Sequence, residues 1–234
     1  MNTALPPLLK GISSMATRAL LADLTAAFEA QTGVKVAIES VGGVDAAQRV
    51  ASGEALDLVL LASDALDKLI AAGHVQPGRV DYVHSPVAVA VPAGAPLPDI
   101  GSEAALKAAV QAAPTIGYST GPSGGHLMRL FERWGLATEL ASRTVQAKPG
   151  VPVGRQVASG EVALGFQQLS ELKDLPGITV VGLLPADCAF ITTFSGCVAS
   201  ASVRADAARA FLAFLNTPQT AALKQRHGMT PAGV

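Results

Sequence analysis

The chain has 234 residues, enough for one large domain or two small ones, and its 50% hydrophobic and 15% charged residues exclude a mainly disordered protein. The formal net charge of −1, without a basic amphipathic stretch, argues against a protein that binds nucleic acid or a membrane surface. No apolar run approaches the roughly 20 residues that span a bilayer.

Short apolar runs alternate with amphipathic stretches along the chain, and this alternation predicts βαβ units around a largely parallel sheet. In the first part of the chain, strands are expected at 8–12, 34–40 and 56–62. Helices are expected at 17–32, where Gly33 is a candidate C-cap, and at 45–52 and 65–72.

The remainder of the chain continues the alternation. Further strands are expected at 87–91, 115–118, 143–147, 162–166, 178–181 and 190–199. Further helices are expected after Ser102 as far as 113, from the loop at 121–124 as far as 134, and at 152–159, 205–216 and 218–227.

One pentapeptide occurs twice. Val-Ala-Ser-Gly-Glu stands at 50–54 and again at 157–161, each time at the end of a short helix and before an apolar strand. Either one helix–glycine–strand turn is used twice, or the chain contains two lobes of similar topology.

Polar loops follow three of the expected strands, at the end of an α/β sheet where ligands usually bind. In the first loop, Ser13 or Ser14 could donate to an anion or cap the next helix. In the second loop, Gly42 and Gly43 allow close approach of backbone to ligand, and Asp45 is expected to cap the following helix.

The third loop, 118–126, is the most informative stretch of the chain. Ser119, Thr120, Ser123 and Gly124 lie between a strand and a helix, and the N–H groups of residues 123–125 could form an anion-binding nest. The stretch lacks the Gly-Lys-Ser/Thr ending of a P-loop and the G-x-G-x-x-G pattern of dinucleotide sites. His126 would be a surface or supporting residue, or a catalytic candidate.

Two later positions could add polar groups to such a site. Arg155, at a helix start, could hold a carboxylate through two parallel hydrogen bonds or remain a solvated charge. Either Gln167 or Gln168 should offer an amide, because adjacent strand residues face opposite sides.

Other chemistry finds no support in the motifs. His74, His84, His126 and His227 lack metal-ligand spacing, and no catalytic triad or nucleophile elbow is evident, so no metal or cofactor is expected. The two cysteines, Cys188 and Cys197, should be small buried residues, and their spacing does not decide whether they pair.

Several of these segments together resemble the molybdate-binding-like branch of the periplasmic solute-binding proteins. The resemblance covers nearly the whole chain and depends on the segments at 11–14, 52–64, 118–124, 158–166 and 211–218. It implies the α/β, two-lobe type 2 periplasmic-binding ("Venus flytrap") fold with mixed, mostly parallel sheets and ligand bound in the interlobe cleft. Lobe I would comprise 1–86 and 195–234, and lobe II 87–194.

Two departures from the molybdate pattern bear on the ligand. Gly42-Gly43 stands where molybdate sites use a hydroxyl, and Gln167-Gln168 where they use a tyrosine. We therefore expect a monomer that binds a small anion, an organic carboxylate rather than molybdate. Because some proteins that resemble this branch isomerise small polycarboxylates such as aconitate, an isomerase with His126 as candidate base is the alternative. A molybdate or tungstate receptor and a ligand-sensing module are weaker alternatives.

The resemblance also bears on location and partners. The sequence as written shows no secretory leader and predicts a cytoplasmic protein. If a leader has been trimmed, the resemblance implies a periplasmic protein that delivers its ligand to the permease of an ABC transporter.

Overall fold

The computed structural model describes residues 8–148 and 150–233, which divide into two compact units. Unit 1 extends to His84 and resumes at Thr193, and unit 2 is Ser85–Thr192. These limits lie two residues before those expected from the sequence. Strands β4 (Val80–Pro92) and β9 (Ile191–Val198) each contain residues of both units, so the chain crosses between the units within strands.

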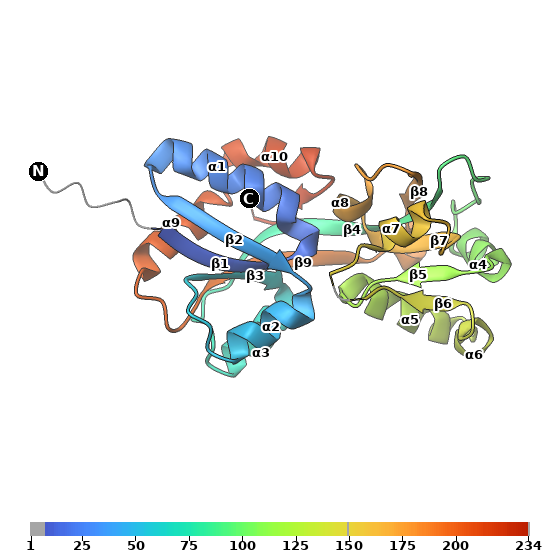
Figure 1. The fold of residues 1–234 in the computed structure, drawn as a ribbon, viewed down its shortest axis with the longest axis horizontal. Coiled ribbons are helices and arrows are strands. Elements are labelled where there is room, and N and C mark those ends of the chain that lie inside the picture. The colour runs from blue at the N-terminus through green and yellow to red at the C-terminus, as the bar shows by residue number, and fades with distance from the viewer. Residues whose placement is uncertain (1–7, 149, 234) are drawn as a thin grey trace, which may run out of the picture. The chain divides into compact units, whose positions relative to one another are not determined.

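The sheet of unit 1 has the strand order β2-β1-β3-β9 (Figure 1). Its parallel strands are β1 (Leu8–Ser14), β2 (Lys35–Val41) and β3 (Leu58–Ala62). Strand β9 runs antiparallel to β3, and the two-residue strand β10 (Thr230–Pro231) pairs antiparallel with the first part of β4.

Helices cover both faces of the unit 1 sheet. The helices on one face are α1 (Arg18–Thr32), α9 (Ala205–Phe214) and α10 (Ala221–Arg226), with 3₁₀ turns at Met15–Thr17 and Pro218–Thr220 before α1 and α10. The helices on the other face are α2 (Gly43–Ala51) and α3 (Ser63–Ala71). Strand β3 is buried throughout because Leu58 and Leu60 pack toward the first layer, whereas Val59 and Leu61 pack toward the second.

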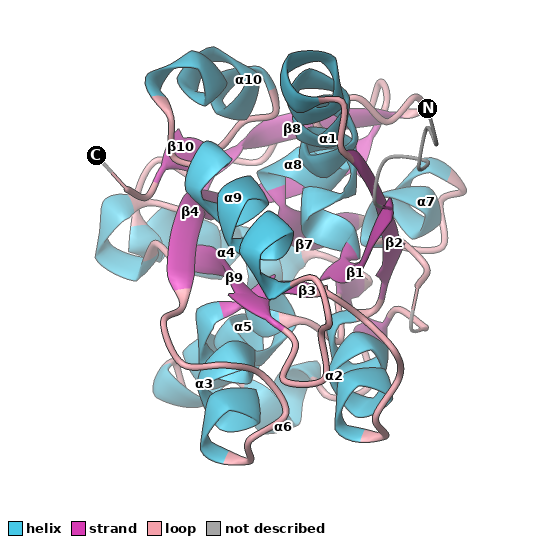
Figure 2. Ribbon diagram, turned by 90° about the vertical axis from the view of Figure 1, so that its left-hand side faces the viewer, coloured by secondary structure: helices cyan, strands magenta, loops and turns pink. Residues whose placement is uncertain are grey.

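Unit 2 has the strand order β4-β7-β5-β6. Its parallel strands are β5 (Ile116–Tyr118), β6 (Thr144–Gln146) and β7 (Leu164–Gln168). Strand β4 runs antiparallel to β7 and also pairs with β8 (Ile178–Leu183). One face carries α4 (Glu103–Ala112), α5 (Pro122–Arg133) and α6 (Ala137–Leu140), and the other carries α7 (Val153–Ala158) and α8 (Leu169–Leu172) (Figures 1 and 2).

The two units share one topology. In each, a central strand (β1 or β5) pairs in parallel with two neighbours, and the second neighbour (β3 or β7) pairs with an antiparallel strand. The repeated pentapeptide occupies the same turn in both. Gly53 and Gly160 have φ angles of 84° and 79°, and the serine before each donates its hydroxyl to the carbonyl three residues earlier, at 2.8 and 3.0 Å. The structure therefore favours two lobes of similar topology.

Most expected elements are present, with corrected ends. Ser102 accepts a hydrogen bond from Ala105 N at 3.1 Å and caps α4, as predicted. The prediction that Asp45 caps α2 is wrong, because Gly42 is the N-cap and Asp45 lies in the first turn. The sequence also did not predict several short elements, among them α6, α8, β10 and a 3₁₀ turn at Ala186–Cys188.

Candidate functional site

The carboxyl ends of β1 and β2 bring two serines together in unit 1. Ser13 pairs with Ser40 in the parallel register, and their hydroxyl oxygens lie 2.8 Å apart. Ser13 is fully buried, so its hydroxyl is fixed between the two strands. These residues and the loop that follows β2 form what we term the unit 1 edge.

Ser14 is the unused polar group of this edge. Its side chain is 8% exposed, and within the described residues its hydroxyl oxygen has no hydrogen-bond partner. A Cβ built on Gly43 would stand 3.9 Å from the Ser14 Cβ, so the glycine leaves the space beside this serine open. A buried hydroxyl without a partner is costly unless a ligand or water completes it.

A second serine pair stands at the carboxyl end of β5 in unit 2. The hydroxyl oxygens of Ser119 and Ser123 lie 2.9 Å apart, and Gly121 N donates to Ser119 Oγ at 3.2 Å. Ser123 is buried, whereas Thr120 is exposed. A Cβ on Gly124 would overlap the Ser119 carbonyl oxygen, so only glycine lets α5 begin so close to the strand.

The expected nest of three N–H groups is only partly available. Gly124 N and Gly125 N donate to the Gly121 carbonyl at 3.1 and 3.2 Å, and the nest prediction is wrong for these two groups. Ser123 lies in the first turn of α5 behind Pro122, where backbone N–H groups have no intrahelical acceptor. The Ser123 N–H and the hydroxyls of Ser119 and Ser123 are donors at this junction.

Three strands end side by side at this same margin. In the parallel register, Tyr118 of β5 pairs with Gln146 of β6 on one side and with Phe166 of β7 on the other. The loops that follow these strands therefore share one edge, which we term the unit 2 edge. It brings Ser119, which follows β5, close to Gln167, near the end of β7.

Two glycines let α7 approach the sheet. Gly117 and Gly165 are paired in register, and a Cβ on either would lie 2.8 Å from Val162 or 2.5 Å from Val157. The close packing places the backbone N–H of Gly154, in the first turn of α7, 3.4 Å from the side-chain oxygen of Gln167. The Gln167 side chain is buried.

The opposite end of the Gln167 amide reaches a carboxyl group. Gln167 Nε2 donates to Glu171 Oε1 at 2.8 Å. Burial raises the pKa of Glu171 to about 7, and the hydrogen bond from Gln167 opposes that rise. Glu171 was not a sequence candidate. The sequence signal that could have identified Glu171 was its spacing of four residues from Gln167 across a strand-to-helix junction.

Gln168 points to the other face of the sheet. With its amide oriented to satisfy both ends, the oxygen accepts from Thr192 Oγ1 at 2.6 Å and the nitrogen donates to Ser85 Oγ at 2.9 Å. The two glutamines thus face opposite sides, as strand alternation predicts. Gln168 joins β7 to the neighbouring strands and has no free donor for a ligand.

The side chains of Arg155 and His126 take no part in the hydrogen bonds described for the two edges. Arg155 is exposed on α7, and in the described part of the chain no acidic side chain forms an ion pair with it. The His126 ring stacks on Phe190 at 4.4 Å, and its Nε2 donates to the Cys188 carbonyl at 3.2 Å. Burial lowers the pKa of His126, and these contacts give its ring a packing role.

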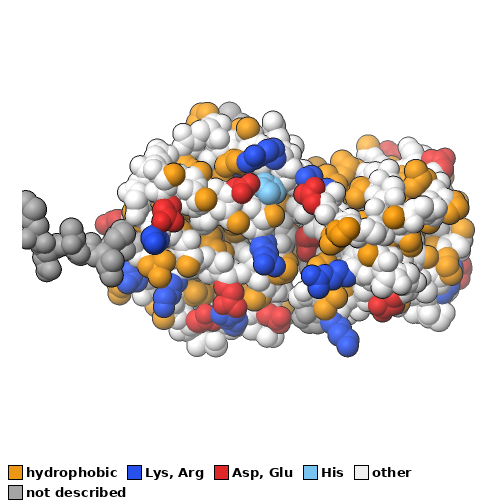
Figure 3. Space-filling view, turned by 45° about the horizontal axis from the view of Figure 1, so that its top comes forward, with side chains coloured by type: hydrophobic (Ala, Val, Ile, Leu, Met, Phe, Trp, Pro, Cys, Tyr) orange, Lys and Arg blue, Asp and Glu red, His pale blue; other side chains and the backbone are white. Residues whose placement is uncertain are grey.

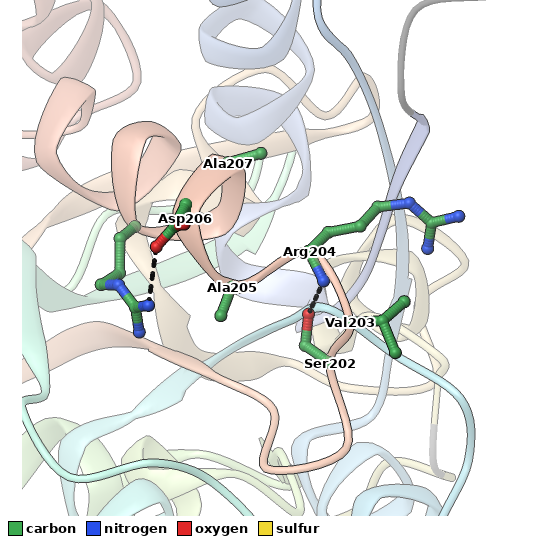
Figure 4. Close-up of a pocket in the computed structure, with 7 residues that line it drawn as sticks. Ser202, Val203, Arg204, Ala205, Asp206 and Ala207 are labelled. Atoms are coloured by element: carbon green, nitrogen blue, oxygen red, sulfur yellow. Dashed lines mark hydrogen bonds and ion pairs between the residues drawn. The ribbon is translucent and has the colours of Figure 1, made fainter.

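A pocket lies elsewhere in unit 1, around the start of α9 (Figure 4). Ser202 Oγ accepts from Arg204 N at 3.1 Å, and Arg209 pairs with Asp206 at 2.9 Å. Ser202 also donates to Asp57, which precedes β3, so the pocket is at the amino ends of the strands. That position is the opposite margin of the sheet from the unit 1 edge.

Other ligand chemistry finds little support in the described residues. They contain no group of three or more His, Cys, Asp or Glu that could hold a metal ion. Cys188 and Cys197 are buried, as predicted, and unpaired. Among the helices of residues 8–148 and 150–233, none is long and apolar enough to cross a bilayer. On the face in Figure 3, acidic and basic side chains are interspersed.

Comparison with known proteins extends over nearly the whole chain. The family model described as bacterial extracellular solute-binding protein matches residues 9–230. The chain is 40% identical over 227 residues to a protein of Pseudomonas sp. named aconitate isomerase, a match that covers 94% of this chain and 86% of that protein.

Solved structures share the fold at lower identity. The periplasmic molybdate-binding protein of Azotobacter vinelandii superposes with a TM-score of 0.78 at 22% identity, covering 95% of this chain and 98% of the other. A tungstate ABC transporter protein of Geobacter sulfurreducens gives 0.75 at 18% identity, covering 94% and 98%. These likenesses show an α/β fold of the two-lobe periplasmic-binding type, as predicted.

Proposed function

Because the chain belongs to the bacterial extracellular solute-binding protein family, we propose that it binds a small unsaturated polycarboxylate and isomerises it by a 1,3-proton shift. Aconitate is the first substrate to test. The observation that carries the proposal is the 40% identity to aconitate isomerase over 94% of this chain. Serine hydroxyls at the unit 1 edge, and separately at the unit 2 edge, are donors of the kind that bind such an anion.

The donors at the two edges suit carboxylates. Ser14 brings a buried hydroxyl without a partner, and Ser123 brings a hydroxyl and a first-turn N–H. In a 1,3-proton shift, removal of a proton next to a carboxylate places negative charge on that carboxylate as an enolate. Fixed hydrogen-bond donors stabilise this charge as it develops, and no redox cofactor is required.

A receptor that binds a carboxylate without changing it is the second candidate. It is favoured by the family and by the solved structures of proteins named for molybdate and tungstate. Gly42 and Gln168 bear on the choice of anion. Gly42 has no side chain, and the Gln168 amide is hydrogen-bonded to Thr192 and Ser85. Neither residue therefore adds a side-chain donor for molybdate.

The deciding experiment is proton NMR of cis-aconitate and of trans-aconitate incubated separately with the protein. Interconversion from both sides toward one ratio supports the isomerase. A rise in melting temperature with aconitate but no interconversion supports the receptor. Stabilisation by molybdate or tungstate alone would contradict both carboxylate proposals.

Matched serine variants test the two edges. We expect Ser14→Ala and Ser123→Ala each to weaken aconitate binding by about tenfold, because each removes one donor worth about 1.5 kcal/mol to a charged group. The control is Ser159→Ala, which removes an exposed hydroxyl bonded only to a local carbonyl. If both edge variants bind aconitate as the control does, the edges are not the binding site.

A further inference from the structure

We propose that the Glu171 carboxyl carries the proton during this isomerisation and that Gln167 is its positioning residue. The inference deepens the proposed function and depends on it. It replaces His126, the only titratable candidate that the sequence suggested, with a residue of the unit 2 edge.

The geometry holds the carboxyl group in a defined place. Gln167 is buried between two partners, accepting from Gly154 N at 3.4 Å and donating to Glu171 Oε1 at 2.8 Å. Only one oxygen of Glu171 is engaged by that amide. Because Gln167 follows Phe166 directly, Gln167 stands at the edge that Ser119 and its serine partner also occupy, and Glu171 lies in α8, which begins two residues later.

The surroundings of Glu171 are nearly free of charge. Its pKa of about 7 results from burial, opposed only by the Gln167 hydrogen bond. Of the charged groups on the packed elements, Arg155 of α7 is exposed, and Lys173, next to α8, pairs with Asp174 at 2.9 Å. Strand β8, also packed against α8, carries no charged residue. A carboxyl group in this state is divided between acid and base at neutral pH, as a proton carrier requires.

The step balances without another reactant. The Glu171 carboxylate removes a proton from the methylene carbon of aconitate, and the electron pair of the C–H bond forms a new double bond to the central carbon. The electron pair of the original double bond moves onto the carboxylate of the vinylic carbon, which becomes the enolate. The former vinylic carbon then takes the proton back from the Glu171 carboxylic acid. The double bond has moved by one position, the carboxylate is regenerated, and nothing is oxidised or reduced.

His126 is a poorer candidate on the same criteria. One face of its ring is stacked on Phe190, and its Nε2–H is donated to the Cys188 carbonyl. Burial lowers its pKa, as do the neighbouring Arg129 and Arg133. A His126→Gln variant should therefore retain aconitate turnover within about threefold.

The test compares Glu171→Gln with Glu161→Gln. Glu161 is an exposed carboxylate of unit 2 that lies just before the amino end of β7. It accepts a hydrogen bond from Gln156 Nε2. Turnover of trans-aconitate in D₂O is followed by NMR, and aconitate binding by calorimetry. We expect Glu171→Gln to lower kcat by about 10²–10⁴-fold while the Kd changes less than threefold, and Glu161→Gln to match the parent.

Two more variants keep the result decisive. Glu171→Asp retains a carboxyl group, so it should turn over aconitate faster than Glu171→Gln does. This variant is the one to use if Glu171→Gln folds poorly. Gln167→Leu removes the hydrogen bond that holds the Glu171 pKa down, so the midpoint of the kcat–pH profile should move to higher pH. An unchanged midpoint would overturn the role of Gln167.

The two proposals fail in different ways. If the parent protein interconverts aconitate and Glu171→Gln does so within threefold, the assignment of Glu171 is wrong and the isomerase stands. If the parent does not interconvert cis- and trans-aconitate, both proposals are overturned.

Discussion

Replacing Gly124 by alanine should destabilise the protein, whereas the same change at Gly125 of this helix should not. A Cβ at this position would overlap the Ser119 carbonyl oxygen, lie 2.9 Å from the carbonyl carbon and 3.1 Å from the Tyr118 ring. The first two atoms are backbone and cannot rotate away, so either the start of α5 or the end of β5 must move.

The neighbouring glycine provides the matched control. A Cβ on the exposed Gly125 would stand 3.6 Å from Arg129 Nη1, an ordinary contact with the end of a flexible side chain. Both substitutions gain about 1 kcal/mol of helix propensity. Only Gly124→Ala also incurs overpacking, which costs about 3 kcal/mol at the upper end of its usual range.

The two variants should therefore differ by about 3 kcal/mol, or roughly 6–12 °C in melting temperature for a chain of this size. Thermal unfolding followed by circular dichroism measures the difference. Gly124→Ala should melt below the parent, and Gly125→Ala slightly above it. If the two variants melt within 2 °C of each other, the close approach of α5 to Ser119 is not a constraint on this protein.

Three further predictions concern ionisable side chains. Lys224 is 1% exposed, and burial lowers its pKa from 10.5 to about 8. Lys224→Met should therefore raise the free energy of unfolding in urea by about 2 kcal/mol at pH 7. This gain should fade between pH 8 and 10.5, where the lysine of the folded parent is already neutral. Asp57 accepts from Lys10 N at 3.0 Å and from Ser202 Oγ at 2.7 Å, so Asp57→Ala should lose about 2 kcal/mol in the same assay by removing the acceptor of both groups, whereas an unchanged midpoint would show that water replaces the carboxylate. Because the folded protein favours protonated Glu171, the parent should lose stability relative to Glu171→Gln as the pH rises from 4.5 to about 7, and melting curves that stay parallel over this interval would contradict the raised pKa.

Local patterning made much of the fold predictable. Continuous apolar residues identified β3, glycine and serine caps marked the ends of α1 and α4, and the alternation of strands and helices indicated an α/β protein. The elements that escaped prediction, such as α6 and α8, have four residues each, too few to display a helical period.

The candidate site was less predictable, because its key contacts join distant residues. The strand-to-helix junctions around Ser13 and Ser123 could be located from the sequence alone, although Ser13 belongs to β1 and Ser123 to α5. The link from Gly154 through Gln167 to Glu171 depends on how closely α7 approaches two paired glycines, which no local pattern reports. His126 attracted notice because of its residue type, yet its ring is held by Phe190.

The way the chain crosses between the units also has a consequence for synthesis on the ribosome. Unit 2 is one continuous segment, Ser85–Thr192, and can fold once that segment has emerged. In unit 1, strand β3 must wait for β9, which is made more than a hundred residues later and pairs Leu58 with Val198. During that interval Leu58–Ala62, a wholly apolar edge, has no partner on one side. A nascent chain stalled before Thr193 should therefore be a strong client for chaperones that bind exposed hydrophobic strands.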